Sequence, residues 1–309
     1  MTSFRTIALI GAPSSIGIRP YETGLPRHLD QAPRVLRELG LIARVGAEDT
    51  GDLVPAAYRD FTRVPRQVRN ESEVRDYVLA IAKMVEATVR AGKFPLVIGG
   101  DCSIVLGTTL GARSATGRPI GLVYVDGHAD FATPDESRSG SAASMCLGLT
   151  VGRGDTPLAR LAGEPLVDAR NVVLIGRRDF HEPWYGHEAL ARSGALDLPD
   201  PTARARGYAG TAKEALERVA AAELSGFWIH VDVDVLDPTV MPAVDSPEPG
   251  GPGMEELEEL LAPLVSHPKA LGMELTIYDP ALDPDRSAGA RLLTLLERLL
   301  ATSTTGASR

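Results

Sequence analysis

The sequence predicts an α/β fold with three layers, α/β/α, around a single, mostly parallel sheet of about eight strands. Short apolar runs alternate with amphipathic stretches along almost all of the 309 residues, an order typical of a parallel sheet covered by helices on both faces. Hydrophobic residues make up 44% of the chain, enough for a large core. Because no repeat or clear linker divides the sequence, we expect one domain over residues 1–309, with a disordered tail over residues 302–309.

Short apolar runs bounded by turn residues predict the strands. These are Ile7–Ile10, Pro95–Ile98, Leu122–Val125, Val172–Ile175, Phe227–Val233 and Ala270–Ile277. Amphipathic spacing predicts helices between them. The helices are Asp30–Leu39, Glu71–Ala91, a stretch after Ser103, Ser141–Leu149, Lys213–Leu224, Glu255–Val265 and Ala288–Leu300. Ligands of such sheets bind beyond the carboxyl ends of the strands, so functional residues are expected there.

The charge balance is acidic, with a formal charge of −9 and a pI near 5.3. A surface for nucleic acid or anionic membranes needs the opposite bias, so neither is an expected partner. No apolar stretch reaches the length of a membrane span, and the N-terminal residues lack a basic-then-apolar leader. The two cysteines do not form a disulfide framework. The expected location is therefore the cytoplasm.

The stretch Leu122–Asp130 ends a buried strand with three potential metal ligands, Asp126, His128 and Asp130. Alternate residues of an extended backbone share a face, so we expect these side chains to converge. Carboxylate and imidazole together form a suitable ligand set for a divalent metal. Taken alone, the triplet fits equally well a turn whose acids face water.

Two further strand ends carry comparable groups. Cys102 follows one strand within Gly99–Ser103, and Asp232 and Asp234 follow another on the face that His230 also occupies. Several carboxylates converging on one pocket repel each other and raise their pKa values, and two divalent cations relieve that cost. Three such clusters at one sheet edge therefore predict a binuclear metal site rather than three solvated turns.

These motifs resemble those of the arginase/agmatinase (ureohydrolase) family. The family sequences GGDHS, DAHxD and DxDxxDP appear here in the same order as GGDCS, DGHAD and DVDVLDP, after an IGAP turn at Ile10–Pro13 and the stretch Ala32–Leu39. The resemblance spans about Ile7 to Leu300. It implies an arginase/deacetylase-like fold and a centre of two divalent metals, usually Mn²⁺, whose bridging hydroxide attacks an amidine or guanidine carbon.

The resemblance also implies the ligands of each metal. One metal would be held by Cys102, Asp126, Asp130 and Asp232, and the other by Asp126, His128, Asp232 and Asp234. Asp126 and Asp232 would then bridge the two ions. Asp130 and Asp234 are also candidates for steering protons, whereas Asp237 is expected in a turn rather than as a ligand.

Cys102 stands where the family has the histidine of GGDHS. A strand-to-helix turn favours ionisation of its thiol, so we favour a metal ligand over an inert core residue or a covalent nucleophile. A thiolate would bring the site to five negative charges against four positive ones. This balance raises the pKa of the bridging water, or shifts the preference toward Zn, Fe or Co.

The remaining departures remove the family's substrate contacts. Ala143 falls where arginases have a proton-shuttle histidine, Ala132 where they have a carboxylate-binding asparagine, and Ile277 where they have a guanidinium-binding glutamate. Arg178–Glu182 replaces an acidic segment, and Glu274 takes the place of a neighbouring aspartate. L-Arginine is consequently a doubtful substrate.

Other side chains are candidates to replace these contacts. His181, in a loop expected to overhang the site, is the preferred proton donor, ahead of His230, a candidate core residue, and His187, expected at a surface helix start. Ser139 is expected to contact a substrate carboxylate. Glu274, together with Thr276 and Tyr278 on one strand face, is a candidate for further substrate contacts.

The expected function is hydrolysis of a C–N bond in a small guanidino or amidino compound. Family members that combine a cysteine ligand with loss of the guanidinium glutamate are associated with hydroxylated guanidines, so an N-hydroxyguanidine hydrolase of the hydroxyarginine type is the alternative. The second alternative is a metal-binding member of the family that has lost its catalytic activity. No His-His pair occurs, which disfavours a deacetylase. The resemblance suggests a homotrimer or homohexamer, and a monomer is the alternative assembly state.

Overall fold

The structure, a computed structural model, describes residues 5–181 and 183–301, so the tail expected over residues 302–309 lies outside the described residues. Eight strands in the described chain form one sheet in which every pairing is parallel. They are β1 (Ile7–Ala12), β2 (Glu48–Asp52), β3 (Phe94–Gly99), β4 (Gly121–Val125), β5 (Val172–Ile175), β6 (Leu196–Leu198), β7 (Phe227–Asp232) and β8 (Ala270–Thr276). Their spatial order is β2-β1-β3-β8-β7-β4-β5-β6. The predicted α/β fold is confirmed.

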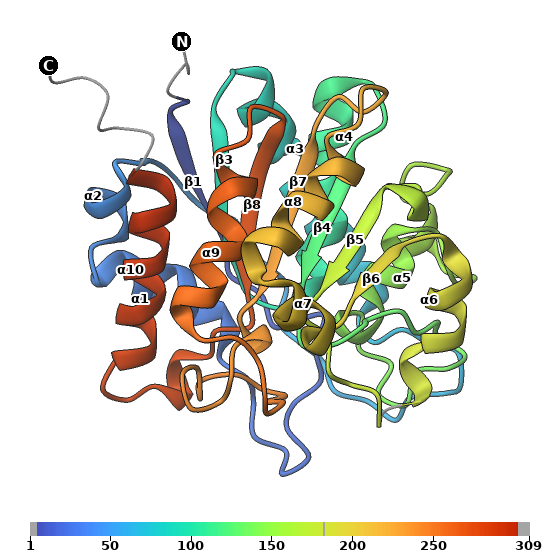
Figure 1. Cartoon of the computed structure of the whole chain (residues 1–309). Coiled ribbons are helices and arrows are strands. Elements are labelled where there is room, and N and C mark those ends of the chain that lie inside the picture. Colours follow the sequence, from blue (N-terminus) through green and yellow to red (C-terminus); the bar gives the residue numbers. More distant parts are fainter. Residues whose placement is uncertain (1–4, 182, 302–309) are drawn as a thin grey trace, which may run out of the picture.

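Helices cover both faces of the sheet (Figure 1). They are α1 (Ala32–Glu38), α2 (Leu41–Val45), α3 (Glu71–Arg90), α4 (Val105–Thr116), α5 (Cys146–Thr150), α6 (His187–Ser193), α7 (Asp200–Arg206), α8 (Tyr208–Val219), α9 (Met254–Val265) and α10 (Ser287–Ala301). Helices α3 and α4 pack together behind the sheet, and α8, α9 and α10 pack in succession in front of it. Within the described residues, none of the helices has the length and apolar character needed to cross a membrane.

The central strands are buried on both faces. Strands β3, β4 and β7 contain no exposed residue, which is why they read as continuous apolar runs rather than as alternating patterns. Trp228 and Tyr124 are the largest of the fully buried side chains. Burial of each such side chain contributes roughly 1.5–3 kcal/mol to folding.

The six predicted strands are present, with ends shifted by one or two residues or unchanged. Strands β2 and β6 and helices α2 and α7 were not predicted, and of α6 only the start at His187 was expected. Helix α8 starts earlier than expected because Tyr208 is buried at its first residue, where its hydroxyl donates a 2.7 Å hydrogen bond to Asp200. The expected helix Ser141–Leu149 is a 3₁₀ turn, Ala143–Met145, followed by α5.

The carboxyl ends of all the strands lie at the lower edge of the sheet in Figure 1. The three motifs found in the sequence follow β3, β4 and β7, which together with β8 are the four central strands. The fold therefore brings the expected metal ligands together over the middle of the sheet.

Candidate metal centre

The loop after β4 presents Asp126, His128 and Asp130 without continuing the strand. The His128 amide donates to Asp126 Oδ1 at 2.6 Å, and Asp130 takes a left-handed φ of 46°. The expected extended backbone was therefore wrong, because a tight turn rather than strand alternation directs these side chains. Asp179 fixes the turn by accepting a 2.8 Å hydrogen bond from the Ala129 amide.

A second turn follows β7. Asp232 ends the strand and caps the 3₁₀ helix Val233–Val235, with its Oδ1 accepting a 2.8 Å hydrogen bond from the Asp234 amide. This turn places Asp234 Oδ2 3.0 Å from His128 Nδ1. The Gly127 amide also donates to Asp234 Oδ1 at 3.1 Å. The loops after β4 and β7 are thus bonded directly to each other.

The third loop, after β3, is held by Asp101. Its buried carboxylate accepts hydrogen bonds from the Ser14 hydroxyl at 3.0 Å and the Gly17 amide at 3.1 Å. A Cβ on Gly100 would collide with the Ser14 backbone, so the motif needs glycine there. This packing fixes the start of the 3₁₀ helix Cys102–Ile104.

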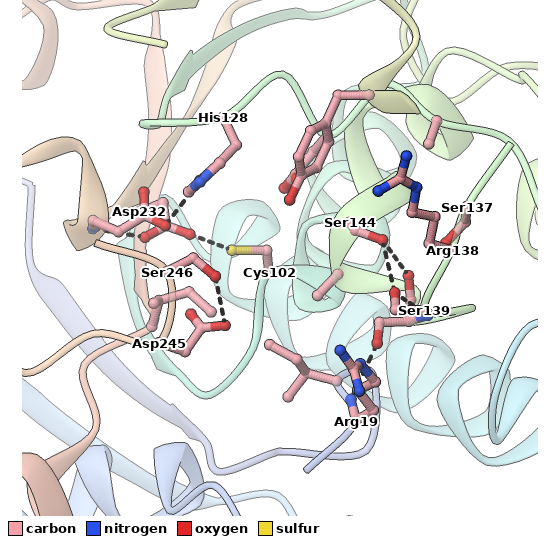
Figure 2. Close-up of a pocket in the computed structure, with 18 of the residues that line it drawn as sticks. Arg19, Cys102, His128, Ser137, Arg138, Ser139, Ser144, Asp232, Asp245 and Ser246 are labelled. Carbon is pink, nitrogen blue, oxygen red and sulfur yellow. Dashed lines mark hydrogen bonds and ion pairs between the residues drawn. The ribbon is translucent and has the colours of Figure 1, made fainter. Parts of the chain in front are cut away.

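Cys102 points from that helix toward Asp232, as Figure 2 shows, and its thiol donates to Asp232 Oδ2 at 2.7 Å. Its sulfur also lies 3.3 Å from Thr276 Oγ1 on β8. Figure 2 shows His128 approaching the same point from the β4 loop. The structure therefore gathers side chains from all three sequence motifs into one cluster.

Two groups of potential ligands lie close enough to hold a metal ion. Ligand atoms within 4.8 Å of one another come from Cys102, Asp126 and His230 in one group, and from Asp126, His128 and Asp234 in the other. Asp126 belongs to both, as expected of a bridging ligand, and its Oδ2 is buried without a hydrogen-bond partner in the described chain. The donor set and this unpartnered oxygen fit two divalent ions.

The structure places two expected ligands differently. Neither Asp232 nor Asp130 belongs to either group, and Asp232 contacts Cys102. Asp130 Oδ2 instead accepts hydrogen bonds from the Tyr124 hydroxyl at 2.8 Å and the Cys146 thiol at 3.3 Å. Tyr124 and Cys146 were not predicted as partners of Asp130, although a phenol inside an otherwise apolar strand is a signal for such a contact.

Burial makes this cluster electrostatically costly. Burial and the neighbouring Asp234 raise the pKa of Asp126 to about 6, and burial together with nearby carboxylates raises the pKa values of Asp130 and Asp232 well above the ordinary range. Burial likewise raises the pKa of Cys102 well above its usual value. Loss of solvent therefore opposes the ionisation that the turn was expected to favour. Positive ions would reverse that cost.

A cavity of about 650 Å³ opens above the cluster. Figure 2 shows Cys102, His128 and Asp232 on one side of it and Arg138 and Ser139 on the other. Other serines line the Ser139 side. They are Ser137, Ser141 and Ser144. The pocket therefore has an acidic floor at the metal ligands and a polar, cationic wall opposite.

The three positions that lack the family's polar contacts also line this pocket. Ala132, Ala143 and Ile277 all face it. Ile277 has a left-handed φ of 70°, held by a 2.9 Å hydrogen bond from its amide to the Gly100 carbonyl. The pocket thus presents small or apolar side chains at these positions.

Glu274 does not occupy the position in the substrate site that was expected for it. It is fully buried and does not line the pocket. Its Oε1 lies 2.8 Å from His230 Nδ1, because the two residues are register partners on β8 and β7. Tyr278 is also turned away, with its hydroxyl bonded to Asp283 at 2.7 Å. The expected substrate contact by Glu274 was wrong.

The structure keeps His181 outside the cluster. Its side chain is 62% exposed, and its Nε2 lies 3.4 Å from Glu248 Oε1. Glu248 lines the pocket, so this ion pair connects His181 to the edge of the site. His187 begins α6 as expected, but its Nε2 is 3.1 Å from Asp179 Oδ2.

Arg178 braces the ligand loops rather than facing the pocket. Its guanidinium donates to the backbone carbonyls of Asp234, at 3.0 Å, and of Val235, at 2.9 Å. The sequence analysis placed this segment in the substrate site and missed its bracing role, and Glu182 lies outside the described residues. Asp237 occupies a turn as expected, accepting from the amides of Thr239 and Gly250.

Known proteins resemble this chain over nearly its whole length. An arginase from Staphylococcus aureus (strain COL) is 28% identical over 305 residues, covering 96% of this chain and 97% of its own. An arginase from Brevibacillus brevis is 29% identical over 298 residues, covering 94% and 96%. The solved arginase of Bacillus caldovelox superimposes with a TM-score of 0.85 at 26% identity, covering 96% of this chain and 98% of its own.

A formimidoylglutamase structure from Bacillus subtilis, at 21% identity and a TM-score of 0.75, shares the fold and covers 98% of this chain and 88% of its own. The family model described as Arginase family matches residues 5–300. Enzymes of that family are hydrolases of C–N bonds in linear amidines and typically hold a binuclear metal centre, most often Mn²⁺. This chain belongs to the arginase family.

Proposed function

We propose that this protein uses two divalent metal ions to hydrolyse a C–N bond of a small guanidino or amidino compound. The observation that carries the proposal is the buried cluster at the pocket floor, where Asp126 is shared by two groups of potential ligands. Mn²⁺ is the family's usual metal, whereas a thiolate ligand would favour Zn, Fe or Co.

Different side chains of the protein would hold the two ions and accept a proton. Bound there, the ions supply Lewis acidity and lower the pKa of a water molecule. Asp126, His128 and Asp234 would hold one ion, while Cys102 and Asp232, from the loops after β3 and β7, would hold the other. Asp130, which lines the pocket and accepts from Tyr124, would receive a proton from the reacting centre.

The wall opposite the metal ligands favours a substrate that carries a carboxylate. The Arg138 guanidinium lies 4.5 Å from the centre of the Trp184 ring, and within residues 5–181 and 183–301 no carboxylate pairs with it. Arg19 and Arg27, which also line the pocket, are each paired with an acidic side chain. A planar guanidinium binds carboxylates in a bidentate manner, so Arg138 could hold that end beside Ser139.

An N-hydroxyguanidine is the second candidate substrate, and the pocket lining favours it specifically. Ala143 and Ile277 face the pocket where arginases carry a shuttle histidine and a guanidinium-binding glutamate. A hydroxylated guanidine needs less acid assistance in its cleavage, so it tolerates the loss of the histidine better than L-arginine does.

The test is a substrate panel with protein loaded with Mn²⁺, and separately with Co²⁺. L-Arginine and agmatine differ by one carboxylate, and N-hydroxy-L-arginine differs from L-arginine by one hydroxyl. We expect turnover to require the carboxylate and to be greatest for the hydroxylated compound, measured as released urea or hydroxyurea.

The variant Arg138→Gln should raise KM for carboxylate-bearing substrates by about tenfold or more, with kcat little changed. The exposed Arg66, which pairs with Asp135 away from the pocket, supplies the matched control Arg66→Gln. Two bound metals without turnover of any compound in the panel would contradict the proposal and leave the lapsed, metal-binding alternative.

A further inference from the structure

His230 lies in the middle of the sheet, two residues before Asp232 on β7. Its register partners are Tyr124 on β4 and Glu274 on β8, and its side chain is fully buried. The Tyr124 ring stacks on the imidazole with centroids 4.2 Å apart and planes 18° apart. Because alternate strand residues share a face, the imidazole lies on the same side of the sheet as Asp232.

The hydrogen bond to Glu274 determines which ring nitrogen is available. His230 Nδ1 lies 2.8 Å from Glu274 Oε1. In the tautomer whose Nδ1–H donates to this carboxylate, the lone pair of the imidazole lies on Nε2. That Nε2 is buried and has no hydrogen-bond partner in the described residues. A buried polar atom without a partner destabilises the fold unless a ligand satisfies it.

The unpartnered nitrogen belongs to a group of potential ligands. A ring nitrogen of His230, the Cys102 sulfur and an Asp126 oxygen all lie within 4.8 Å of one another. Asp126 Oδ2 is also buried without a partner in the described chain. A single ion between these three side chains would satisfy both atoms. Neither the sequence motifs nor the two expected ligand sets include His230.

We propose that His230 is a ligand of the metal ion on the Cys102 side, with Glu274 as the carboxylate that orients it. This proposal rests on the proposed binuclear function. A neutral imidazole adds a donor without adding to the negative charge of the thiolate and carboxylates. It also accounts for the buried Glu274, because metal-bound histidines commonly donate their other N–H to a carboxylate.

The ligand count can be read directly from the wild-type protein. X-ray absorption of protein loaded with Co²⁺ or Zn²⁺ reports the number of imidazoles bound per metal. We expect two imidazoles for two ions, one from His128 and one from His230. Two ions with only one imidazole would overturn the proposal and leave the binuclear function standing, whereas protein that takes up no metal would overturn the binuclear function itself.

Variants give a second measurement by calorimetric metal titration. His230→Gln should lose about one of the two bound ions, and Glu274→Gln should weaken binding by about 10- to 100-fold. His267→Gln is the control, because His267 lies beside the amino end of β8, where its Nδ1 accepts from the Lys269 amide. A His230→Gln protein that binds two ions with unchanged affinity would contradict the proposal. If that variant does not fold, the wild-type imidazole count decides.

Discussion

At the residue scale, the two cysteines are both buried in or beside the cluster, yet their partners differ. Cys102 bonds to Asp232 and lies in a group of potential ligands, whereas Cys146 bonds to Asp130 and to the Ala143 carbonyl. The geometry therefore favours Cys102 as the sulfur ligand, whereas Cys146 orients Asp130 through a hydrogen bond.

Replacing each cysteine by serine should separate these roles. Cys102→Ser should abolish the sulfur-to-cobalt charge-transfer band of Co²⁺-loaded protein and lower the metal content from about two ions per chain toward one, because a serine hydroxyl is a much weaker ligand. Cys146→Ser should keep both the band and the metal content. A band that survives in Cys102→Ser and disappears in Cys146→Ser would show that the ligand had been assigned to the wrong sulfur.

The sequence predicted that its three motifs converge, because each of them directly follows a buried strand of one parallel sheet. It could not predict Glu274. Glu274 lies within β8 as the register partner of His230, so its side chain contacts His230 rather than the pocket. Tyr278 turns away because β8 ends at Thr276 and Ile277 takes a left-handed φ of 70°. The cross-strand partners of His230 depend on strand order, which a single sequence does not reveal.

At the element scale, the strands that were missed lie at the two edges of the sheet. Strand β2 has the sequence EDTGD, and all five residues are exposed, so it shows neither an apolar run nor alternation. Its place beside β1 is held by Arg37 of α1, which bonds to both oxygens of Asp49 at 2.9 and 3.0 Å. Charged edge strands resist pairing with other chains, which is a reason for this composition.

Arg37→Ala should therefore loosen β2 in a pH-dependent way. The hydrogen bonds from Arg37 hold the pKa of Asp49 below its usual value, so this stabilisation is present above the unfolded pKa of about 3.9 and is lost as pH falls through the lower folded value. We expect a loss of about 1 kcal/mol near pH 7 and less near pH 3, measured by denaturant unfolding.

Arg34→Ala on the same helix is the matched control, because Arg34 forms only an exposed i,i+4 pair with Glu38. Its effect should be a few tenths of a kcal/mol. Hydrogen exchange of the β2 amides should accelerate in Arg37→Ala alone. Equal effects of the two substitutions would show that Arg37 does not anchor the edge strand.

At the scale of the whole molecule, the site and the stability of the fold are coupled. The ligand loops rise from the four central strands, so the repulsion among buried carboxylates acts on the middle of the sheet. Asp126 shares this cost, since it is fully buried and its Oδ2 has no partner in the described residues. Ions that bind the folded protein should relieve the repulsion and stabilise the entire domain.

Metal removal should consequently lower the unfolding temperature. Metal at about 100 times its dissociation constant stabilises the folded state by about 2.7 kcal/mol per site, which corresponds to roughly 4 °C per site for a protein of 309 residues. Asp126→Asn should respond differently. The amide keeps an acceptor for the His128 N–H, a 2.6 Å hydrogen bond in the wild type, and removes one buried charge.

Thermal scans of both proteins, with chelator and with added Mn²⁺, measure the two effects together. The chelated variant should melt at or above the temperature of the chelated wild type, and it should gain little from metal. A variant that is less stable than the wild type in chelator, yet gains as much from Mn²⁺, would mean that Asp126 supports the loop structurally and holds no ion. The expected result would show that the Asp126 carboxylate destabilises the metal-free fold and that bound metal offsets this destabilisation.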